Sequence, residues 1–372
     1  MSLIKSFQGY RNFLQLKKNN TRKIIYFYSE SKNYRNHFED ILNELSNQNK
    51  YQIFYFSSDL NDTEVFNSKV KPIYIGNGIM RMIFFTFLSG DLMIMTLSDL
   101  GNHEIKRSKN CKNYLYLFHS LCSTFKSYTK NAFDNYDFIF ANGDHQINEI
   151  RKTEEIYNLK KKEIINIGYP YLENLKKKIS NKVIDNRVIF APSWSNSKDD
   201  LLENYGLQII EILLRNFKVF FRPHPHSITK SKKTIREIEN KFKKNKNFTL
   251  NQDITELKPF DESSLLLTDN GGICMEYYTL YKRPFICIDY KEKIHNREYK
   301  KISEVSVEEE FKNIFSEKIN IYSLDKLNSK IEDTITSFKF NSKKLDNFFQ
   351  SYNIKFDDTT KKACEKIEKI LF

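Results

Sequence analysis

The chain has 372 residues, 40% of them hydrophobic, and its 60 Lys and Arg outnumber its 47 Asp and Glu to give a formal net charge of +13. This length allows two domains with cores of their own, and the hydrophobic content argues against a disordered chain. The basic balance favours an anionic partner: nucleic acid, an anionic membrane face or a polyanionic substrate. Part of the excess lies in Lys/Asn-rich runs such as residues 241–247, which are equally typical of a solvated surface.

Two apolar segments occur early in the chain. The first 20 residues have no long apolar core and no small-residue cleavage site, so they do not predict a signal peptide. An apolar stripe recurs there at helical spacing: Leu3, Phe7, Tyr10 and Leu14. We expect this stripe to pack on the protein's own body, with a membrane-surface helix as the alternative. Residues 79–88 are too few to span a bilayer and Arg81 interrupts them, so a buried helix is predicted, with a membrane-dipping surface as the alternative.

Short apolar runs alternate with helical or loop-rich segments along the whole chain. In the first half, strands are predicted at residues 23–28, 51–56, 72–75, 92–96, 114–118, 138–141 and 164–167. In the second half, they are predicted at residues 188–190, 219–221, 265–268 and 285–288. Alternation of this kind predicts parallel sheets built from βαβ units.

A polar stretch at residues 176–186, followed by a new strand, marks the expected domain boundary. We therefore predict an α/β fold with two Rossmann-like domains facing a central cleft. The N-terminal domain would span residues 1–178 and the C-terminal domain residues 187–331. The tail at residues 332–372 is expected to form helices that pack back across the domain junction.

The run at residues 217–221 ends in side chains suited to phosphate. Arg222, His224 and His226 alternate with prolines, which cannot donate ladder hydrogen bonds and so end the strand. Arginine offers a planar donor fork, and imidazole can donate to phosphate oxygens or move a proton near neutral pH. The alternative is that these histidines cap a helix or bond the backbone. A zinc pair is disfavoured, because no third ligand lies nearby in sequence.

The run at residues 264–268 ends in a turn, and a helical pattern follows it. The turn consists of Thr268, Asp269, Asn270, Gly271 and Gly272. Its glycines allow close backbone approach, and the helix start offers unpaired N–H groups suited to anions. Glu276 lies one turn inside the helix, where it could accept from ribose hydroxyls. The alternative is an ordinary helix N-cap. Because ligands bind at the carboxyl ends of parallel strands, the two strand endings predict a pocket for a phosphorylated, nucleotide-linked substrate.

The first half offers candidates for the other reactant. His119 directly follows an apolar strand, where a histidine can act as general base toward a hydroxyl, with Ser120 beside it. His103, Lys106 and Arg107 follow another strand and could face an anionic acceptor. A structural histidine and a solvated charged loop are the respective alternatives.

Two further features bear on the chemistry. Ser193, in the sequence APSW, ends the first strand of the second half and is expected to line the pocket, with simple loop packing as the alternative. The five cysteines show no CxxC pair and no metal spacing, which argues against a disulfide scaffold or structural zinc and fits a reducing cytoplasm.

The order APSW, then FRPHPH, then LLLTDNGGICMEYYTLYKRPF resembles the CDP-glycerol glycerophosphotransferase family of teichoic acid and capsule synthesis. Members of that family typically read YAPTW, (K/R)xHP and a TDYSS-type turn followed by an acidic residue and KRP. YLYLFHSLCST stands where the family has a WHG-type segment. The resemblance implies a GT-B fold, with His119 as acceptor-side base, His224 near the donor pyrophosphate and Asn270 to Gly272 as the phosphate-binding turn. In this chain Asn-Gly-Gly replaces Tyr-Ser-Ser, which leaves the identity of the donor open.

The resemblance implies transfer of a glycerophosphate-type unit from CDP-glycerol, or a related CDP-alditol, to an acceptor hydroxyl with release of CMP. The N-terminal domain would hold the acceptor, an anionic polymer, glycan or lipid-linked molecule, and the C-terminal domain the donor. No cofactor is required by the sequence, no metal site is expected, and a need for divalent metal is left open. The enzyme would be cytoplasmic, with peripheral association at the inner membrane face as a further option.

Three alternatives remain. The first is a GT-B glycosyltransferase that uses a CMP- or UDP-sugar donor for capsule or lipopolysaccharide. The second is a catalytically silent partner in a capsule assembly complex. The third, a basic nucleic-acid-binding protein, is remote because the chain has no recognisable binding motif, so no nucleic-acid partner is expected.

Overall fold

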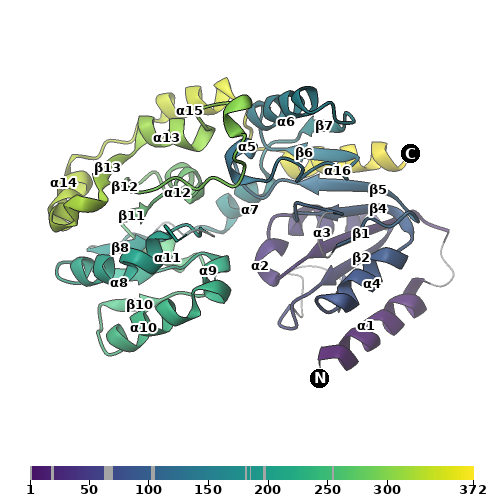
Figure 1. The fold of residues 1–372 in the computed structure, drawn as a ribbon, viewed down its shortest axis with the longest axis horizontal. Helices are drawn as coiled ribbons and strands as arrows, with labels where there is room; N and C mark the ends of the chain where they lie inside the picture. Colours follow the sequence, from purple (N-terminus) through teal and green to yellow (C-terminus); the bar gives the residue numbers. More distant parts are fainter. Residues whose placement is uncertain are drawn as a thin grey trace. The chain divides into compact units, whose positions relative to one another are not determined.

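The computed structural model describes residues 2–17, 21–62, 70–101, 105–180, 182–184, 186–195, 198–253 and 255–372. The chain divides into two compact units, each with its own parallel sheet (Figure 1). Unit 1 comprises Met1–Asn174, His295–Ser303 and Phe349–Phe372, and unit 2 comprises Leu175–Ile294 and Glu304–Phe348. The domain limits expected at residues 178, 187 and 332 stay predictions.

Unit 1 is built on a parallel sheet, sheet A, with the strand order β3-β2-β1-β4-β5-β6-β7. Its strands are β1 (Ile24–Ser29), β2 (Gln52–Ser57), β3 (Pro72–Tyr74), β4 (Gly90–Met95), β5 (Cys111–Leu117), β6 (Phe138–Ala141) and β7 (Glu163–Asn166). Its helices are α1 (Ser2–Lys17), α2 (Lys32–Arg35), α3 (Glu39–Asn47), α4 (Ile79–Phe87), α5 (Thr124–Ser127), α6 (Asp144–Ile156), the 3-10 helix η1 (Tyr299–Lys301) and α16 (Thr359–Leu371), while α7 (Pro170–Lys178) runs from unit 1 into unit 2.

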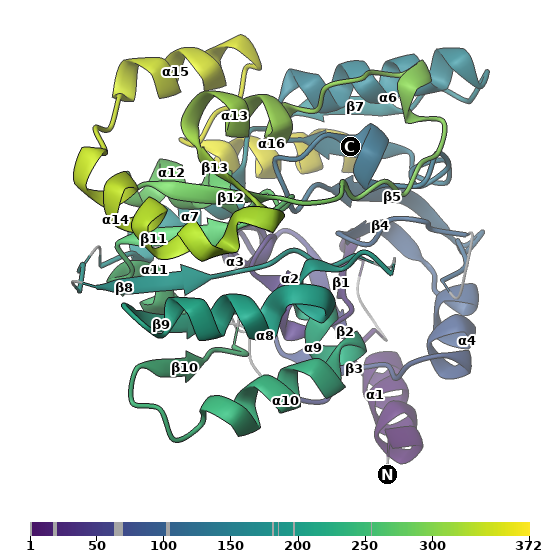
Figure 2. The same ribbon diagram turned by 60° about the vertical axis from the view of Figure 1, so that its left-hand side comes forward.

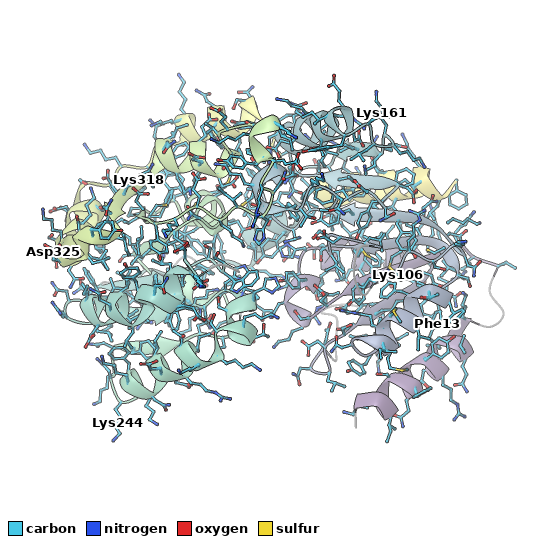
Figure 3. The ribbon with its side chains drawn as sticks, viewed as in Figure 1. Phe13, Lys106, Lys161, Lys244, Lys318 and Asp325 are labelled. Atoms are coloured by element: carbon cyan, nitrogen blue, oxygen red, sulfur yellow. The ribbon has the colours of Figure 1, made fainter. Side chains whose placement is uncertain are left out.

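Sheet A is buried on both faces, which explains why its strands read as continuous apolar runs. Successive side chains of a strand point to opposite faces. Tyr26 and Tyr28 of β1 therefore join a core with Phe13 of α1 and with Phe84 and Phe85 of α4 (Figure 3). The intervening Ile25 and Phe27 join a second core, to which α3 and α16 contribute side chains.

Unit 2 is built on a second parallel sheet, sheet B, with the strand order β10-β9-β8-β11-β12-β13. Its strands are β8 (Arg187–Phe190), β9 (Lys218–Phe221), β10 (Phe248–Leu250), β11 (Leu265–Thr268), β12 (Phe285–Asp289) and β13 (Glu317–Asn320). Its helices are α8 (Leu201–Leu213), α9 (Pro225–Lys230), α10 (Lys232–Phe242), α11 (Lys258–Glu262), α12 (Ile273–Tyr281), α13 (Val307–Phe315), the 3-10 helix η2 (Ile321–Lys326) and α14 (Leu327–Ser337), while α15 (Ser342–Ser351) runs from unit 2 into unit 1. Apolar residues of α8 and α10 cover the strands on one face.

Each strand predicted from the sequence overlaps a strand of the structure, and the α/β class with two parallel-sheet domains is confirmed. In both sheets the strand order reverses once, between β1 and β4 in sheet A and between β8 and β11 in sheet B (Figure 2). The loops that follow such a pair of strands diverge, and this opening at the carboxyl edge is where open α/β sheets bind ligands.

Candidate functional site

At the reversal point of sheet B, two hydrogen bonds connect the loops after β8 and β11. The backbone N–H of Ser193 donates to Oδ1 of Asp269 over 2.7 Å, and the Ser193 hydroxyl donates to Oδ2 over 2.9 Å. The hydroxyl of Thr268 donates to the carbonyl oxygen of Ala191 over 2.8 Å. The structure thus brings Ser193, Thr268 and Asp269 together, and their contacts fix the two strand endings against each other. That they line a donor pocket stays a prediction.

The surroundings of Asp269 shift the pKa of its carboxyl in opposing directions. Burial raises the pKa of its carboxyl, while the two hydrogen bonds from Ser193 and the nearby Lys312 oppose that rise. Lys312 lies on α13, and its Nζ is 3.3 Å from the side-chain oxygen of Asn270. Lys312 is a candidate that the sequence patterns did not single out, because only the fold brings α13 beside the turn after β11.

The turn after β11 leads directly into α12. Gly272, which has no side chain, occupies the N-cap position of this helix, so no N-cap side chain competes for its first N–H groups. The side-chain amide of Asn270 donates to the carbonyl oxygen of Lys291 over 2.8 Å, which anchors the turn. Glu276 lies half-buried in the first turn of the helix. The start of α12 therefore has the properties of an anion-binding helix terminus.

A Cβ placed on Gly271 would lie 3.5 Å from the Cβ of Ser193, an ordinary contact distance, and the backbone at Gly271 does not have a positive φ. The packing around this turn therefore leaves room for a Cβ at Gly271.

Arg222 is buried at the end of β9 and is engaged by the protein itself. Its Nη1 donates to Oδ1 of Asn251 over 2.6 Å and to the carbonyl oxygen of Glu256 over 2.9 Å. Its guanidinium lies 4.6 Å from the ring centre of Phe260. These contacts brace the segment after β10 against β9. Phosphate binding by Arg222 stays a prediction.

His224 and His226 lie at the start of α9, next to the only tryptophan of the chain. Nδ1 of His224 accepts from the backbone N–H of His226 over 3.2 Å, so His224 caps this helix. A neutral His224 with this bond carries its proton on Nε2. The two imidazole rings stack with centroids 5.5 Å apart, and His226 lies 4.8 Å from the Trp194 ring. The structure thus joins the APSW and RPHPH segments through ring contacts.

In unit 1, His119 follows β5 at the carboxyl edge of sheet A and is surrounded by aromatic rings. The hydroxyl of Tyr116 lies 3.4 Å from its Nδ1, and the ring of Tyr34 lies 5.8 Å away. The hydroxyl of Tyr169 donates to the His119 carbonyl oxygen over 3.1 Å. Ser120 orders the same loop: its hydroxyl accepts from the N–H of Cys122 over 2.9 Å. Both residues lie where the sequence predicted, and their roles stay predictions.

A second histidine, His37, lies beside His119 and was not found from the sequence. The ring centroids are 5.7 Å apart. Burial of the His37 ring, with a smaller contribution from His119, holds its pKa well below the ordinary histidine value. Its Nδ1 is shielded from solvent and has no hydrogen-bond partner among the described residues. Since no strand ending or motif marks residue 37, only the fold could bring this pair to notice.

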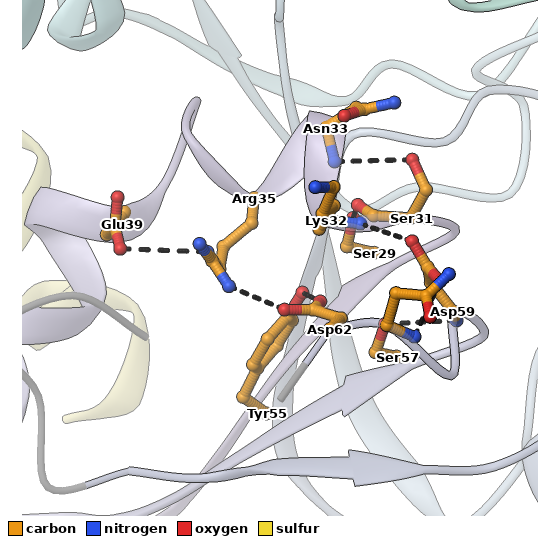
Figure 4. Close-up of polar contacts among 11 residues, drawn as sticks. Ser29, Ser31, Lys32, Asn33, Arg35, Glu39, Tyr55, Ser57, Asp59 and Asp62 are labelled. Atoms are coloured by element: carbon orange, nitrogen blue, oxygen red, sulfur yellow. Dashed lines mark hydrogen bonds and ion pairs between the residues drawn. The ribbon is translucent and has the colours of Figure 1, made fainter. Parts of the chain in front are cut away.

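Polar contacts at the ends of β1 and β2 fix the segment that carries His37 (Figure 4). Nη1 of Arg35 pairs with Oδ1 of Asp62 at 2.5 Å, and Nε of Arg35 lies 3.6 Å from Glu39. The hydroxyl of Tyr55 donates to the second oxygen of Asp62. Arg35 and Glu39 flank His37 in sequence, so these ion pairs hold the imidazole in position against the sheet edge.

Of the three charged acceptor-side candidates, the structure describes Lys106 and Arg107. His103 lies outside the described residues. Lys106 is exposed, with Nζ 3.5 Å from the carbonyl oxygen of Gly101 (Figure 3). Arg107 precedes β5 and pairs with Asp137, just ahead of β6, at 2.8 Å. Arg107 therefore lies at the amino edge of sheet A, and the structure does not bring it to His119.

No protein-family profile matches the sequence, and no curated protein matches it. Solved structures do share the fold. The UDP-GlcNAc 2-epimerase of Methanocaldococcus jannaschii, in complex with UDP-GlcNAc and UDP, is 15% identical with a TM-score of 0.56, over 94% of this chain and 99% of that one. The Neisseria meningitidis enzyme bound to UDP-GlcNAc is 12% identical with a TM-score of 0.54, over 93% and 100%. At these identities the likeness concerns the fold alone: the chain has two parallel-sheet α/β domains of the GT-B kind, as the sequence predicted.

Proposed function

We propose that this chain is a GT-B glycosyltransferase that uses a nucleotide-activated sugar, a CMP- or UDP-sugar, as its donor. Two observations support a nucleotide sugar over the CDP-alditol favoured by the sequence motifs. The fold is shared with proteins crystallised with UDP-GlcNAc. The turn Asn270 to Gly272 also lacks the serine hydroxyls of the glycerophosphotransferase pattern.

The observation that carries the proposal is the construction of the reversal point between β8 and β11. Its two loops are clamped by Ser193 and Asp269, and the start of α12 lies directly beyond the clamp. Backbone N–H groups at a helix start bind phosphate without any particular side chain. Lys312 adds a positive charge next to Asn270, which would offset the charge that develops on a departing phosphate.

Acid–base chemistry is assigned to two histidines. In the proposed reaction an acceptor oxygen forms a bond to the anomeric carbon of the sugar, and the bond from that carbon to the donor phosphate oxygen breaks. The nucleotide leaves as UDP or CMP. We propose that His119 takes the acceptor proton and that His224 donates a hydrogen bond to the phosphate, each contributing as positioned acids and bases usually do. The acceptor would be a glycan, an anionic polymer or a lipid-linked molecule.

The second candidate is transfer of glycerophosphate from CDP-glycerol or a related CDP-alditol, and the motif order APSW, FRPHPH and KRPF supports it. Here the acceptor oxygen attacks the β-phosphorus and CMP leaves. The two reactions differ in the fate of one atom. The β-phosphorus enters the product in glycerophosphate transfer and stays with the nucleotide in transfer from a UDP-sugar.

A donor screen by thermal shift tests the proposal, because a ligand that binds the folded state raises Tm by mass action. The compounds are UDP-sugars, CMP-sugars, CDP-glycerol and CDP-ribitol. We expect a nucleotide sugar to raise Tm, and Ser193→Ala to weaken that shift. Ser329→Ala, which removes an exposed hydroxyl on α14 of the same unit, is the matched control.

Product analysis with donor labelled at the β-phosphate then assigns the reaction. Label in the polymeric product would establish the CDP-alditol alternative. Formation of an epimerised nucleotide sugar without transfer of the sugar would refute the proposal. The absence of a Tm shift with every nucleotide tested would refute it as well.

A further inference from the structure

Helix α1 contacts the rest of unit 1 through a face of small residues and one aromatic ring. Ser6 and Phe13 are buried on this face. A Cβ on Gly9 would lie 2.1 Å from the carbonyl oxygen of Tyr74, so only glycine allows the helix to approach β3 this closely. At the C-terminal end, Nζ of Lys17 donates to the hydroxyl of Ser89 over 2.6 Å. The orientation of α1 on the sheet is therefore fixed by close packing.

This packing leaves several apolar side chains of α1 in solvent. Phe7 is 63% exposed, and Ile4, Tyr10 and Leu14 are exposed as well. The expectation that this stripe packs on the protein's own body is therefore wrong for Phe7 and Leu14, whereas the Tyr10 ring keeps contacts with Phe13 and Phe84. The side chain of Leu3 lies outside the described residues. The physical reason lies in the opposite face of the helix, where Gly9 permits a closer backbone approach than bulky side chains would.

Helix α4 lies beside α1 (Figures 1 and 2). Phe84 and Phe85 turn inward, while Ile79 and Phe87 are 72% and 67% exposed. The ring of Tyr10 on α1 packs edge-on against Phe84 at 6.0 Å, which joins the two helices. We call the resulting surface the α1–α4 face; its exposed apolar residues are Ile4, Phe7, Tyr10, Leu14, Ile79, Met82, Ile83 and Phe87. The predicted buried helix at residues 79–88 is thus only half-buried.

The charges on this face have one sign. Helix α1 contains Lys5, Arg11 and Lys17 and no Asp or Glu, and Lys5 and Arg11 are exposed. The only charge on α4 is Arg81, which points inward: its Nη1 donates to the Tyr28 hydroxyl over 3.0 Å. The α1–α4 face thus combines an apolar surface with exposed cations, and neither helix contributes a carboxylate.

We propose that the α1–α4 face docks on an anionic lipid bilayer surface, with both helices lying in the plane of the interface. Helices with an apolar stripe and Lys or Arg beside it bind this way, because the apolar side chains enter the acyl boundary while the cations meet anionic headgroups. Of the helices in the described ranges, none is long and apolar enough to cross a membrane. An in-plane position would place the exposed apolar side chains of both helices in the lipid.

A second copy of the chain is a poorer occupant of the face. A twofold dimer brings the same patch of both subunits together. Lys5 and Arg11 would then approach their own copies in an interface to which neither helix brings a carboxylate. Like charges brought together in this way oppose association. Docking on lipid needs no nucleotide and no acceptor, so this proposal is independent of the proposed function.

The test is co-sedimentation of the full chain, without donor, with vesicles of phosphatidylcholine alone or mixed with phosphatidylglycerol. We expect binding to the mixed vesicles only. Phe7→Asp and Ile83→Asp should each lower the partition coefficient at least about 10-fold, because a large apolar side chain no longer enters the lipid. Tyr322→Asp is the matched control: Tyr322 is 87% exposed on η2 in unit 2, and its replacement should leave binding unchanged.

The charge contribution is tested separately. Lys5→Glu and Arg11→Glu should each weaken binding to the anionic vesicles at least about 5-fold, as expected for a cation at an anionic membrane surface. Lys244→Glu, an exposed lysine just beyond α10 in unit 2, is the control (Figure 3). Circular dichroism of each variant should match that of the unaltered chain, because all the replaced side chains are exposed.

Three results would overturn the proposal. The first is absence of binding to the anionic vesicles. The second is an equal loss of vesicle binding in the Phe7→Asp and Tyr322→Asp variants. The third is a dimer in light scattering that Phe7→Asp dissociates, which would assign the face to a second copy instead.

Discussion

The carboxyl edges of the two sheets are assembled in different ways. At the edge of sheet B, hydrogen bonds of Ser193, Asp269 and Asn270 connect neighbouring loops, and the start of α12 is the proposed anion-binding element. At the edge of sheet A, His119 and His37 lie among aromatic rings, and Nδ1 of His37 has no partner within the described residues. We propose that the first edge holds the donor phosphate by backbone N–H groups and that the second takes up the acceptor proton.

The largest expected effect concerns the histidines at the two edges. His119→Ala and His224→Ala should each lower turnover at least about 100-fold, in line with the loss of positioned acid–base groups. The measurement is kcat with the donor identified by thermal shift. His295→Ala is the control: His295 belongs to unit 1, as His119 does, and its replacement should keep turnover within a few-fold of the unaltered chain. Near-normal turnover in both His119→Ala and His224→Ala would refute the assignment of these residues.

A buried group at each edge should also change the unfolding free energy as pH falls, and the two changes should have opposite signs. In unit 1, burial lowers the pKa of His145 from 6.5 to about 4. The unfolded chain therefore takes up this proton first, and stability is lost as pH falls from 6.5 toward 4, by about 3 kcal/mol. In unit 2, burial raises the pKa of Asp269, so its contribution is present below the ordinary value of 3.8 and is lost as pH rises through the folded value.

Denaturant titrations across this pH range measure both changes in the unfolding free energy. His145→Gln keeps a donor for the Leu121 carbonyl and should reduce the loss of unfolding free energy at acid pH. Asp269→Asn should remove the opposite dependence of the unfolding free energy on pH. Because Trp194 is the only tryptophan and belongs to unit 2, its fluorescence reports that unit, while circular dichroism reports both. An unchanged pH slope in His145→Gln would contradict the assigned burial of that imidazole.

Replacing one glycine at each edge by alanine should lower the unfolding free energy by different, smaller amounts. Gly168, before α7, has a φ of +80°, and a Cβ there would lie 2.6 Å from the carbonyl oxygen of Lys355. Gly168→Ala should therefore cost about 2 kcal/mol of unfolding free energy through strain and contact. Gly271→Ala meets only an ordinary contact and should cost less than about 0.5 kcal/mol. Equal losses in urea unfolding would show that the Gly271 turn is more tightly packed than its geometry indicates.

The difference between the edges also explains what the sequence could predict. The site residues that the sequence predicted for sheet B lie in three short segments at strand ends, so apolar runs followed by Ala-Pro-Ser-Trp, Pro-His-Pro or Asn-Gly-Gly identify them. His37 and Lys312 reach their edges from α2–α3 and α13, and no local pattern marks them. Strands β10 and β13 were missed because they are short edge strands with few buried side chains, which leaves little apolar signal.

The smallest expected effect concerns Arg107, which the sequence grouped with the acceptor side. Its guanidinium pairs with Asp137 at 2.8 Å and donates to the carbonyl oxygen of Asn135 over 2.7 Å, at the amino edge of sheet A. Because this pair is partly exposed, Arg107→Ala should lower the unfolding free energy by about 1 kcal/mol or less. Turnover should stay within about two-fold, since the chemistry assigned to unit 1 lies with His119 at the opposite edge. A loss of turnover comparable to that of His119→Ala, with stability unchanged, would instead place the acceptor at the amino edge and reverse the roles assigned to the two edges of sheet A.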